Sequence, residues 1–194
     1  MEIICHRRNT LNQLNSTPHN FGVEVDIRSN GEKLIINHDP FKKGVEFSKW
    51  ISKYNHGTLI LNIKEEGLED KILFYLDKYQ IKSFFFLDQS LPFIIKMSNN
   101  GFSNSAVRVS NYESIETALN FKNKVKWIWV DIFENFPLNF EEYNKLKSAN
   151  FKLCLVSPEL HQSNILSIDN LKNSLNKQKI LFDAVCTKLP DKWS

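Results

Sequence analysis

Two carboxylates stand two residues apart in an alternating stretch near the start of the 194-residue chain. Residues 22–27 read GVEVDI, so that apolar residues alternate with Glu24 and Asp26. Side chains two apart on a strand share a face, and both carboxylates are therefore expected to point the same way. Such a pair suits a divalent cation that prefers oxygen ligands. An exposed strand edge carrying a solvated acidic pair fits this stretch equally well.

Histidines are expected close to the acidic pair on both sides. The polar tract 29–32 predicts a turn, and the extended residues after it bring His38 back beside the acidic strand. At the start of the chain, residues 2–6 predict a short apolar strand that ends in His6 and is followed by Arg7. Histidine suits proton transfer or nucleophilic attack because its pKa lies near neutral pH.

The rest of the chain alternates apolar strand-like runs with amphipathic runs. After the hairpin a short helix is expected at 45–54. Further strands are expected at 58–64, 83–88, 105–110, 126–131, 151–157 and 182–188, with helices at 68–80, 91–101, 111–123, 140–150 and 164–178 between them. Together with the first two strands this makes eight. Strands that alternate with helices indicate a parallel sheet, and eight of them close a barrel.

The sequence therefore predicts an α/β fold, a compact single-domain (β/α)8 TIM barrel over residues 1–194 with a small hairpin insertion after the second strand. Such barrels usually have ~250 residues and about 200 at the least, so the connections here must be short. Catalytic groups in this fold lie where strands end. Some polar residues at those ends face solvent at the rim, but convergence on one pocket explains their number better. They are His6, Arg7, Glu24, Asp26, Asn62, Lys64, Asp88, Arg108, Asp131, Glu159 and Lys188.

The order of these motifs resembles the glycerophosphodiester phosphodiesterase family. That family is a TIM barrel whose first strand ends in His-Arg, whose second strand carries Glu-x-Asp, and whose hairpin insertion ends in His-Asp. The matching segments here are His6-Arg7, Glu24-Val25-Asp26 and His38-Asp39. The resemblance implies that His6 and His38 are catalytic and that Glu24 and Asp26 bind a divalent metal.

Later segments depart from the family pattern. The third strand usually carries Glu-x-Lys, but here it carries Asn62-Ile63-Lys64, which keeps the lysine and loses a carboxylate. Asn62 can still offer a neutral carbonyl oxygen as a metal ligand, with Glu65, Asp88 or Glu159 as alternatives. The family's closing Thr-Asp-x-Pro corresponds to TKLP, with Lys188 where Asp is usual. The loop after His6-Arg7 is also shorter than in the family.

The resemblance implies a metal-dependent hydrolase of lipid metabolism that cleaves a small polar phosphodiester of the glycerophosphodiester type. Mg²⁺ is the preferred ion and Ca²⁺ the alternative. Arg7, Lys64 and Arg108 would hold the phosphate oxygens. Two other functions stay open: a cyclising phosphodiester lyase of the sphingomyelinase-D-like kind, and a binding barrel that has lost turnover.

Composition and charge favour a small-molecule substrate over a macromolecular partner. The net charge is +3 and the basic residues are dispersed, which argues against a nucleic-acid surface. No targeting segment or apolar run of membrane-spanning length is visible. The three cysteines, Cys5, Cys154 and Cys186, lie in apolar strand-like contexts and are expected to be free thiols, which favours the cytoplasm. The oligomeric state is left open.

Overall fold

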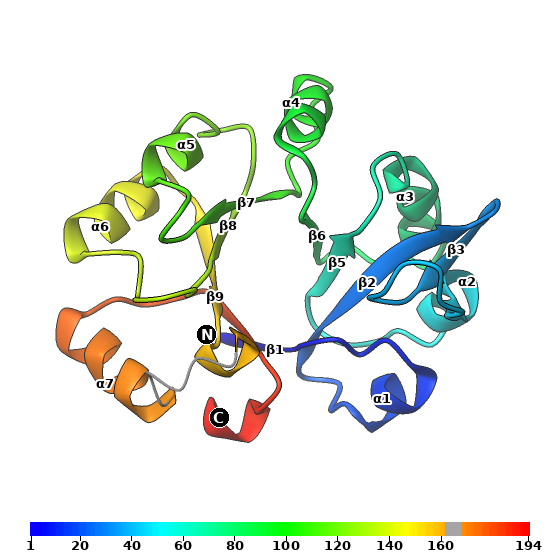
Figure 1. Ribbon diagram of the computed structural model, residues 1–194, viewed down its shortest axis with the longest axis horizontal. Coiled ribbons are helices and arrows are strands. Elements are labelled where there is room, and N and C mark those ends of the chain that lie inside the picture. The colour runs from blue at the N-terminus through cyan, green and yellow to red at the C-terminus, as the bar shows by residue number, and fades with distance from the viewer. Residues whose placement is uncertain (162–167) are drawn as a thin grey trace. The chain divides into compact units, whose positions relative to one another are not determined.

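The computed structural model describes residues 1–161 and 168–194. The chain divides into two compact units, which are described separately (Figure 1). The N-terminal unit comprises Ile4–Lys96, and the C-terminal unit comprises Met1–Ile3 together with Met97–Ser194.

Parallel strands form the centre of the N-terminal unit. Its parallel strands and helices are β1 (Glu2–Cys5), α1 (Leu11–Ser16), β2 (Gly22–Asn30), α2 (Phe47–Ile51), β5 (Leu59–Ile63), α3 (Glu69–Lys78), β6 (Phe84–Leu87) and α4 (Leu91–Asn99). Strand β2 pairs in parallel with β1 and β5, and β5 pairs in parallel with β6. Apart from Asn62, β5 is a continuous apolar run, and it is buried on both faces, as is typical of central parallel strands.

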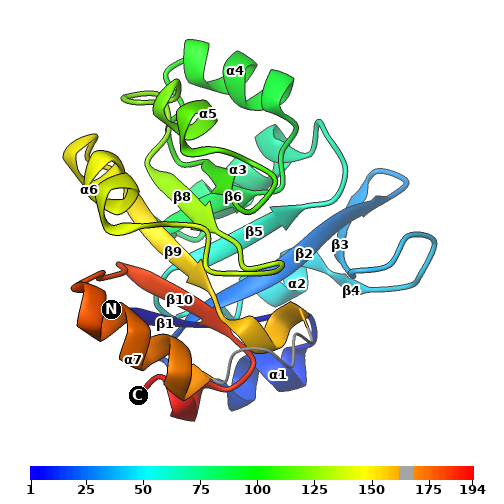
Figure 2. The ribbon, with the colours of Figure 1, turned by 60° about the vertical axis from the view of Figure 1, so that its left-hand side comes forward.

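A hairpin extends from the far end of β2. Strand β2 pairs antiparallel with β3 (Lys33–Ile36), and β3 pairs antiparallel with the short strand β4 (Val45–Glu46) (Figure 2). Gly31 makes the turn with a φ of +59°, a left-handed conformation that glycine adopts without steric cost. The small hairpin predicted after the second strand is therefore confirmed.

The C-terminal unit repeats the alternation of strands and helices. Its elements are β7 (Ala106–Val109), α5 (Ile115–Leu119), β8 (Trp127–Val130), α6 (Phe140–Ser148), β9 (Lys152–Val156), the 3-10 helix η1 (Pro158–His161), α7 (Ile168–Gln178), β10 (Ala184–Thr187) and the 3-10 helix η2 (Pro190–Lys192). The four strands pair in parallel in the order β7, β8, β9, β10. The start of β1 belongs to this unit, where the Glu2 N–H donates to the Asp183 carbonyl at 2.8 Å.

The predicted α/β alternation is confirmed along the chain, with two helices much shorter than expected. The helix predicted over 45–54 is confined to Phe47–Ile51, because Val45 and Glu46 pair with β3 as strand β4. The helix predicted over 111–123 is confined to Ile115–Leu119, because Ser110 and Glu113 close a turn before it through backbone and side-chain hydrogen bonds. Of the helix predicted over 164–178, residues 164–167 lie outside the described residues. Closure of the eight strands into one single-domain barrel concerns how the two units meet and stays a prediction.

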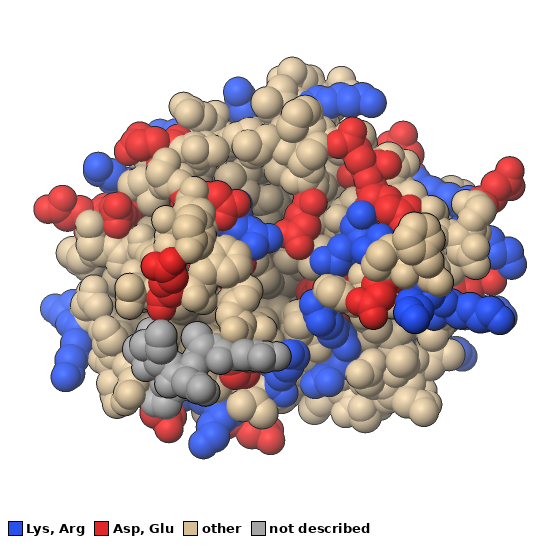
Figure 3. Space-filling view, viewed as in Figure 1, with Lys and Arg blue, Asp and Glu red and all other residues tan. Residues whose placement is uncertain are grey.

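Two further features bear on the choice of partner. In the described part of the chain, no helix combines the length and the apolar character needed to cross a membrane. The face seen in Figure 3 carries Lys and Arg side chains as well as Asp and Glu side chains.

Candidate active site

Glu24 and Asp26 are buried in the middle of the N-terminal unit. Their exposed fractions are 1% and 0%, because β2 lies between β1 and β5. The alternative of an exposed strand edge with a solvated acidic pair is therefore wrong. Burying a charged group is costly unless it is paired, so the partners of these two carboxyl groups define the candidate site.

The surroundings of Glu24 favour the protonated form of its carboxyl group. Its Oε2 accepts the Arg7 N–H at 2.7 Å, and His6 Nε2 lies 3.8 Å from the same oxygen. Burial, followed by repulsion from Asp26, raises the pKa of Glu24 to about 8. The Arg7 N–H, the Lys64 ammonium and a hydrogen bond from Asn62 oppose this increase in the pKa only in part. A divalent cation bound here would compete with this proton.

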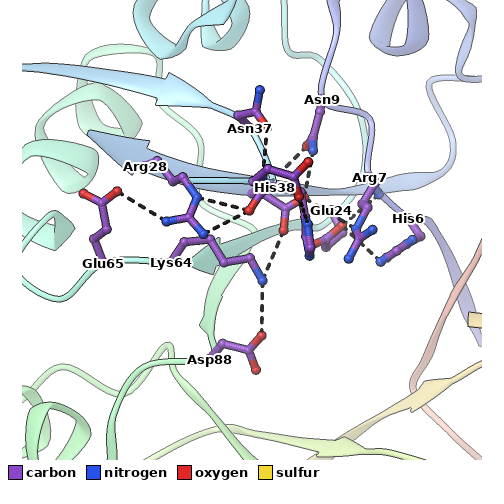
Figure 4. A network of polar contacts seen from close by, with 12 residues as sticks. His6, Arg7, Asn9, Glu24, Arg28, Asn37, His38, Lys64, Glu65 and Asp88 are labelled. Atoms are coloured by element: carbon purple, nitrogen blue, oxygen red, sulfur yellow. Dashed lines mark hydrogen bonds and ion pairs between the residues drawn. The ribbon is translucent and has the colours of Figure 1, made fainter. Parts of the chain in front are cut away.

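Asp26 is surrounded by donors and cations. Asn9 binds it twice: Asn9 Nδ2 donates to Asp26 Oδ2 at 2.7 Å, and the Asp26 N–H donates to Asn9 Oδ1 at 3.1 Å. Arg7 Nε lies 3.6 Å from Oδ2, and Lys64 Nζ lies 3.3 Å from Oδ1. The Asp26 carboxylate is therefore oriented by Asn9 and compensated by two positive charges. Figure 4 labels these three partners, Arg7, Asn9 and Lys64.

Asn62 completes a cluster of oxygens with the two carboxyl groups. It is the register partner of Asp26 on β5 and is 8% exposed. Glu24 Oε1, Asp26 Oδ1 and Asn62 Oδ1 are all buried and accept no hydrogen bond from the described residues. Two carboxyl groups and an amide oxygen fit a hard divalent cation. A cluster of three or more His, Cys, Asp or Glu residues suited to a metal does not occur within residues 1–161 and 168–194.

The turn after β1 positions His6 and Arg7. Arg7 has a φ of +51°, a left-handed conformation that is uncommon for a residue with a side chain. This turn allows the N–H of Arg7 to bind the Glu24 side chain and the N–H of Arg8 to bind the Glu24 carbonyl at 2.9 Å. Trp50 Nε1 donates to the Arg8 carbonyl at 3.0 Å and fixes the turn from the other side.

His38 reaches the same region from the end of β3. The Asn37 N–H donates to the Asp26 carbonyl at 3.1 Å, which places His38 next to the acidic strand as predicted. His38 Nδ1 lies 2.9 Å from Asp39 Oδ1, and this hydrogen bond is the main reason why the pKa of Asp39 is lowered. In Figure 4, His38 and His6 are drawn on either side of Glu24.

Lys64 links Asp26 to Asp88. Lys64 Nζ lies 3.6 Å from Asp88 Oδ2, so Asp88 is engaged with the lysine. Glu65, another alternative metal ligand, accepts hydrogen bonds from the backbone and side chain of Ser29 and pairs with Arg28. These contacts favour Asn62 over either carboxylate as the third ligand.

The remaining candidates belong to the C-terminal unit. Arg108 Nη1 donates to Asp131 Oδ2 at 2.8 Å, and Arg108 Nε lies 3.8 Å from Glu113. Asp131 also binds His161 through its other oxygen. Glu159 accepts hydrogen bonds from the Thr187 hydroxyl and the Lys188 N–H. Whether Arg108 contacts the phosphate stays a prediction.

Two residues with evident positioning roles were not identified as site residues from the sequence. Asn9 precedes Thr10, which caps α1, and the Asn9 side chain binds Asp26. Arg28 donates through Nε and Nη2 to the His38 carbonyl at 3.1 and 3.0 Å. Asn9 lies two residues after Arg7, in the loop that follows a strand. This position is the sequence feature that could have identified it as a site residue.

Comparisons with known proteins agree with this arrangement at the level of fold. No protein-family model matches the sequence, and none of the curated proteins matches it. One solved structure, an Agrobacterium tumefaciens protein assigned as a glycerophosphoryl diester phosphodiesterase, matches with a TM-score of 0.69 at 10% identity, over 98% of this chain and 94% of that chain. The chain has the fold of the glycerophosphodiester phosphodiesterases.

Two further structures with this fold support the same conclusion. A glycerophosphodiester phosphodiesterase from Agrobacterium tumefaciens matches with a TM-score of 0.65 at 11% identity, over 99% of this chain and 98% of that chain. A glycerophosphoryl diester phosphodiesterase from Parabacteroides distasonis matches with a TM-score of 0.63 at 10% identity, over 98% of this chain and 84% of that chain. At such low identity the likeness establishes the fold, and activity must be argued from the site.

Proposed function

We propose that the chain is a metal-dependent phosphodiesterase that hydrolyses a small polar phosphodiester of the glycerophosphodiester type. The observation that carries this proposal is the cluster of buried oxygens from Glu24, Asp26 and Asn62, which accept no hydrogen bond within the described ranges. Asp26 Oδ1 is ion-paired with Lys64, but Glu24 Oε1 and Asn62 Oδ1 are buried acceptors without a hydrogen bond from the described residues. Such an acceptor costs roughly 1–3 kcal/mol, and a divalent cation would supply the partner. The cluster lies in a chain with the fold of this enzyme family.

Glu24, Asp26 and Asn62 would hold the cation, with Mg²⁺ preferred and Ca²⁺ the alternative. When bound, the ion neutralises the charge of the phosphodiester and polarises a phosphoryl oxygen. Glu24 must first release its proton, since its pKa is raised to about 8. Lys64 must share Asp26 with the ion, because its ammonium lies 3.3 Å from Asp26 Oδ1.

Arg7 and Lys64 would bind the remaining phosphate oxygens. The Arg7 side chain is 41% exposed although its Nε lies near Asp26, so part of its guanidinium is available to a ligand. A guanidinium can hold two phosphate oxygens at once, whereas an ammonium acts as a point charge. Arg108 would be a further phosphate ligand by prediction from the sequence alone.

His6 and His38 would carry the proton transfers. The hydrogen bond between His38 Nδ1 and Asp39 leaves Nε2 of this half-exposed ring for the departing alcohol, which suits a general acid. His6 lies against Glu24, where it would take a proton or attack phosphorus. In the first case His6 would deprotonate a water molecule that attacks phosphorus, and in the second case water would later cleave the P–N bond formed with His6. In both cases His38 would protonate the alkoxide as its P–O bond breaks.

One observation favours the alternative of a binding barrel with weakened turnover. Lys64 already pairs with Asp26, and Asn62 supplies no charge where the family has a carboxylate. A panel of glycerophosphodiesters and sugar-linked diesters, assayed with Mg²⁺ and with Ca²⁺, decides between catalysis and binding. Phosphorus NMR of the products separates a monoester, expected here, from the cyclic phosphate that a lyase would release.

The proposed substrate is a small molecule, and the cytoplasm is the proposed compartment. Cys5, Cys154 and Cys186 are all buried and free, which agrees with a reducing compartment.

A further inference from the structure

A pocket of about 650 Å³ lies on the N-terminal unit beside the hairpin. The pocket is lined by Arg28 from β2, by Ile35 from β3, by Glu65, and by Phe41, Lys42 and Lys43 from the loop after His38. Its volume falls in the range of small-molecule sites, about 300–1,000 Å³. The residues described above as holding the metal and carrying the proton transfers do not line it.

Arg28 connects this pocket to the candidate active site. Arg28 lines the pocket, and its guanidinium donates to the carbonyl of His38 at 3.0 Å. Figure 4 shows Arg28 between His38 and Glu65, and each contact is drawn as a dashed line. A ligand group in the pocket would therefore lie one side chain away from the histidine proposed to protonate the leaving alcohol.

The charge of the pocket favours an anion. Three cationic side chains and one carboxylate line it, and the carboxylate of Glu65 pairs with Arg28 at 3.5 Å. Lys42 and Lys43 are exposed, and no carboxylate of the described residues lies within ion-pair distance of either ammonium. Besides the hydrogen bond with His38, the charge of Lys42 helps to lower the pKa of Asp39, but neither lysine is ion-paired with a described residue. The net charge of the pocket is therefore positive, so it attracts an anion and repels an ammonium head group.

The loop that carries the two lysines has a defined conformation. Asn37 Nδ2 donates to the Lys43 carbonyl at 2.8 Å. A side chain at Gly44 would place its Cβ 2.3 Å from the Ile36 carbonyl oxygen, so only glycine permits this approach. Phe41 has a φ of +58° and is fully exposed, so its ring can cover a ligand without first leaving a packed position. Such preorganisation lowers the entropy cost of binding.

We propose that this pocket binds a second anionic group on the substrate, so that the preferred diester carries a phosphate or carboxylate on its leaving alcohol. This inference rests on the proposed function for its link to catalysis. Lys42 and Lys43 would be the residues that determine this specificity, and Arg28 would position His38.

Matched substrates test the proposal. Glycerophosphoglycerol is compared with the same diester carrying a phosphate on its second glycerol, using wild type and the variant Lys42→Gln/Lys43→Gln. We expect kcat/KM of the wild type to be about tenfold higher for the phosphorylated diester, and this preference to vanish in the variant. Lys42→Arg/Lys43→Arg should keep it. The control Lys53→Gln/Lys82→Gln removes two exposed lysines before the amino ends of β5 and β6 and should also keep it.

A binding measurement separates this inference from the proposed function. Calorimetric titration of glycerol 1,3-bisphosphate and of glycerol 3-phosphate needs no turnover. We expect the lysine-to-glutamine variant to bind the bisphosphate about tenfold more weakly and the monophosphate as the wild type does. If the variant binds the bisphosphate more weakly but no diester is cleaved by the wild type, the proposed function is wrong. The proposal that the pocket binds an anionic group is then still supported.

Two results would overturn the inference. One is an unchanged substrate preference together with unchanged bisphosphate binding in Lys42→Gln/Lys43→Gln. The other is cosedimentation of the wild type with vesicles of phosphatidylserine and phosphatidylcholine that is lost in the variant, without any change toward the soluble ligands. The second result would assign Phe41 and the two lysines to an anionic membrane surface.

Discussion

Asp26 and Asn62 are register partners on the parallel strands β2 and β5, and each has a buried oxygen that accepts no hydrogen bond from the residues the structure describes. A carboxylate and a neutral amide therefore stand side by side on neighbouring strands. With Glu24 on the same face, the cluster carries at most two negative charges. Its affinity for a cation should depend strongly on any charge added or removed here.

Adding a charge at Asn62 should strengthen metal binding. Asn62→Glu is expected to bind Mg²⁺ about tenfold more tightly, measured by calorimetry, because a third carboxylate joins the cage. Without metal this variant should be about 1–3 kcal/mol less stable, since another buried carboxyl lacks partners. The control is Asn62→Gln, whose side chain is as long as that of glutamate but carries no charge. Equal Mg²⁺ affinity in wild type and Asn62→Glu would mean that the third ligand lies elsewhere.

The metal-free protein should lose stability as the pH rises toward 8. The pKa of Glu24 is raised from 4.5 to about 8 in the folded chain. Between these values the native state keeps a proton that the unfolded chain releases, so the free energy of unfolding falls by up to about 1.4 kcal/mol per pH unit. Urea unfolding in chelator at several pH values measures this slope.

Two controls connect that slope to Glu24. The slope should flatten in Glu24→Gln, which has no proton to lose. It should also flatten in wild type with saturating Mg²⁺, because the ion replaces the proton. A slope of the same size in Glu24→Gln would show that another group causes it.

Lys64 should affect metal binding and substrate binding in opposite directions. Its ammonium lies 3.3 Å from Asp26 Oδ1, so Lys64→Met removes a competing cation and should tighten Mg²⁺ binding several-fold. The same variant loses a phosphate ligand, and kcat/KM should fall about a hundredfold. Lys64→Arg keeps the charge and is the control. A loss of both metal and substrate binding in Lys64→Met would show a purely structural role.

His6 and His38 should act as a unit. Residues that act in concert each account for most of the rate, so His6→Ala/His38→Ala should be scarcely slower than either single variant. A general acid matters less when the leaving group is a weaker base. An activated aryl diester should therefore partly rescue His38→Ala but not His6→Ala. Rescue of His6→Ala alone would reverse the two roles, and equal losses on both substrates would rule out His38 as the acid.

Local patterns made much of the N-terminal unit predictable. Alternation along β2 placed Glu24 and Asp26 on one face, and the polar tract before β3 located the hairpin that carries His38. Both features depend on neighbouring residues alone, and the order of motifs pointed to the fold that the structural comparisons show. The depth of burial was not predictable, because it depends on β1 and β5 flanking β2.

Contacts that depend on the backbone path of loops were not predictable. Asn9 reaches Asp26 because Arg7 adopts a φ of +51°, which no residue type in that loop demands. Arg28 reaches the His38 carbonyl only because β2 and β3 pair in a particular register. The pocket beside Lys42 and Lys43 likewise depends on how the loop after His38 folds back.

The central claim is that Glu24 and Asp26 hold a divalent cation needed for phosphodiester cleavage. The most direct test measures glycerophosphodiester turnover by wild type, Glu24→Gln and Asp26→Asn, each with Mg²⁺ and with excess chelator. We predict turnover by the wild type with Mg²⁺ and about a thousandfold loss in chelator or in either variant, because several kcal/mol of charge stabilisation disappear. Undiminished turnover in chelator, or in both variants with Mg²⁺, would contradict the account.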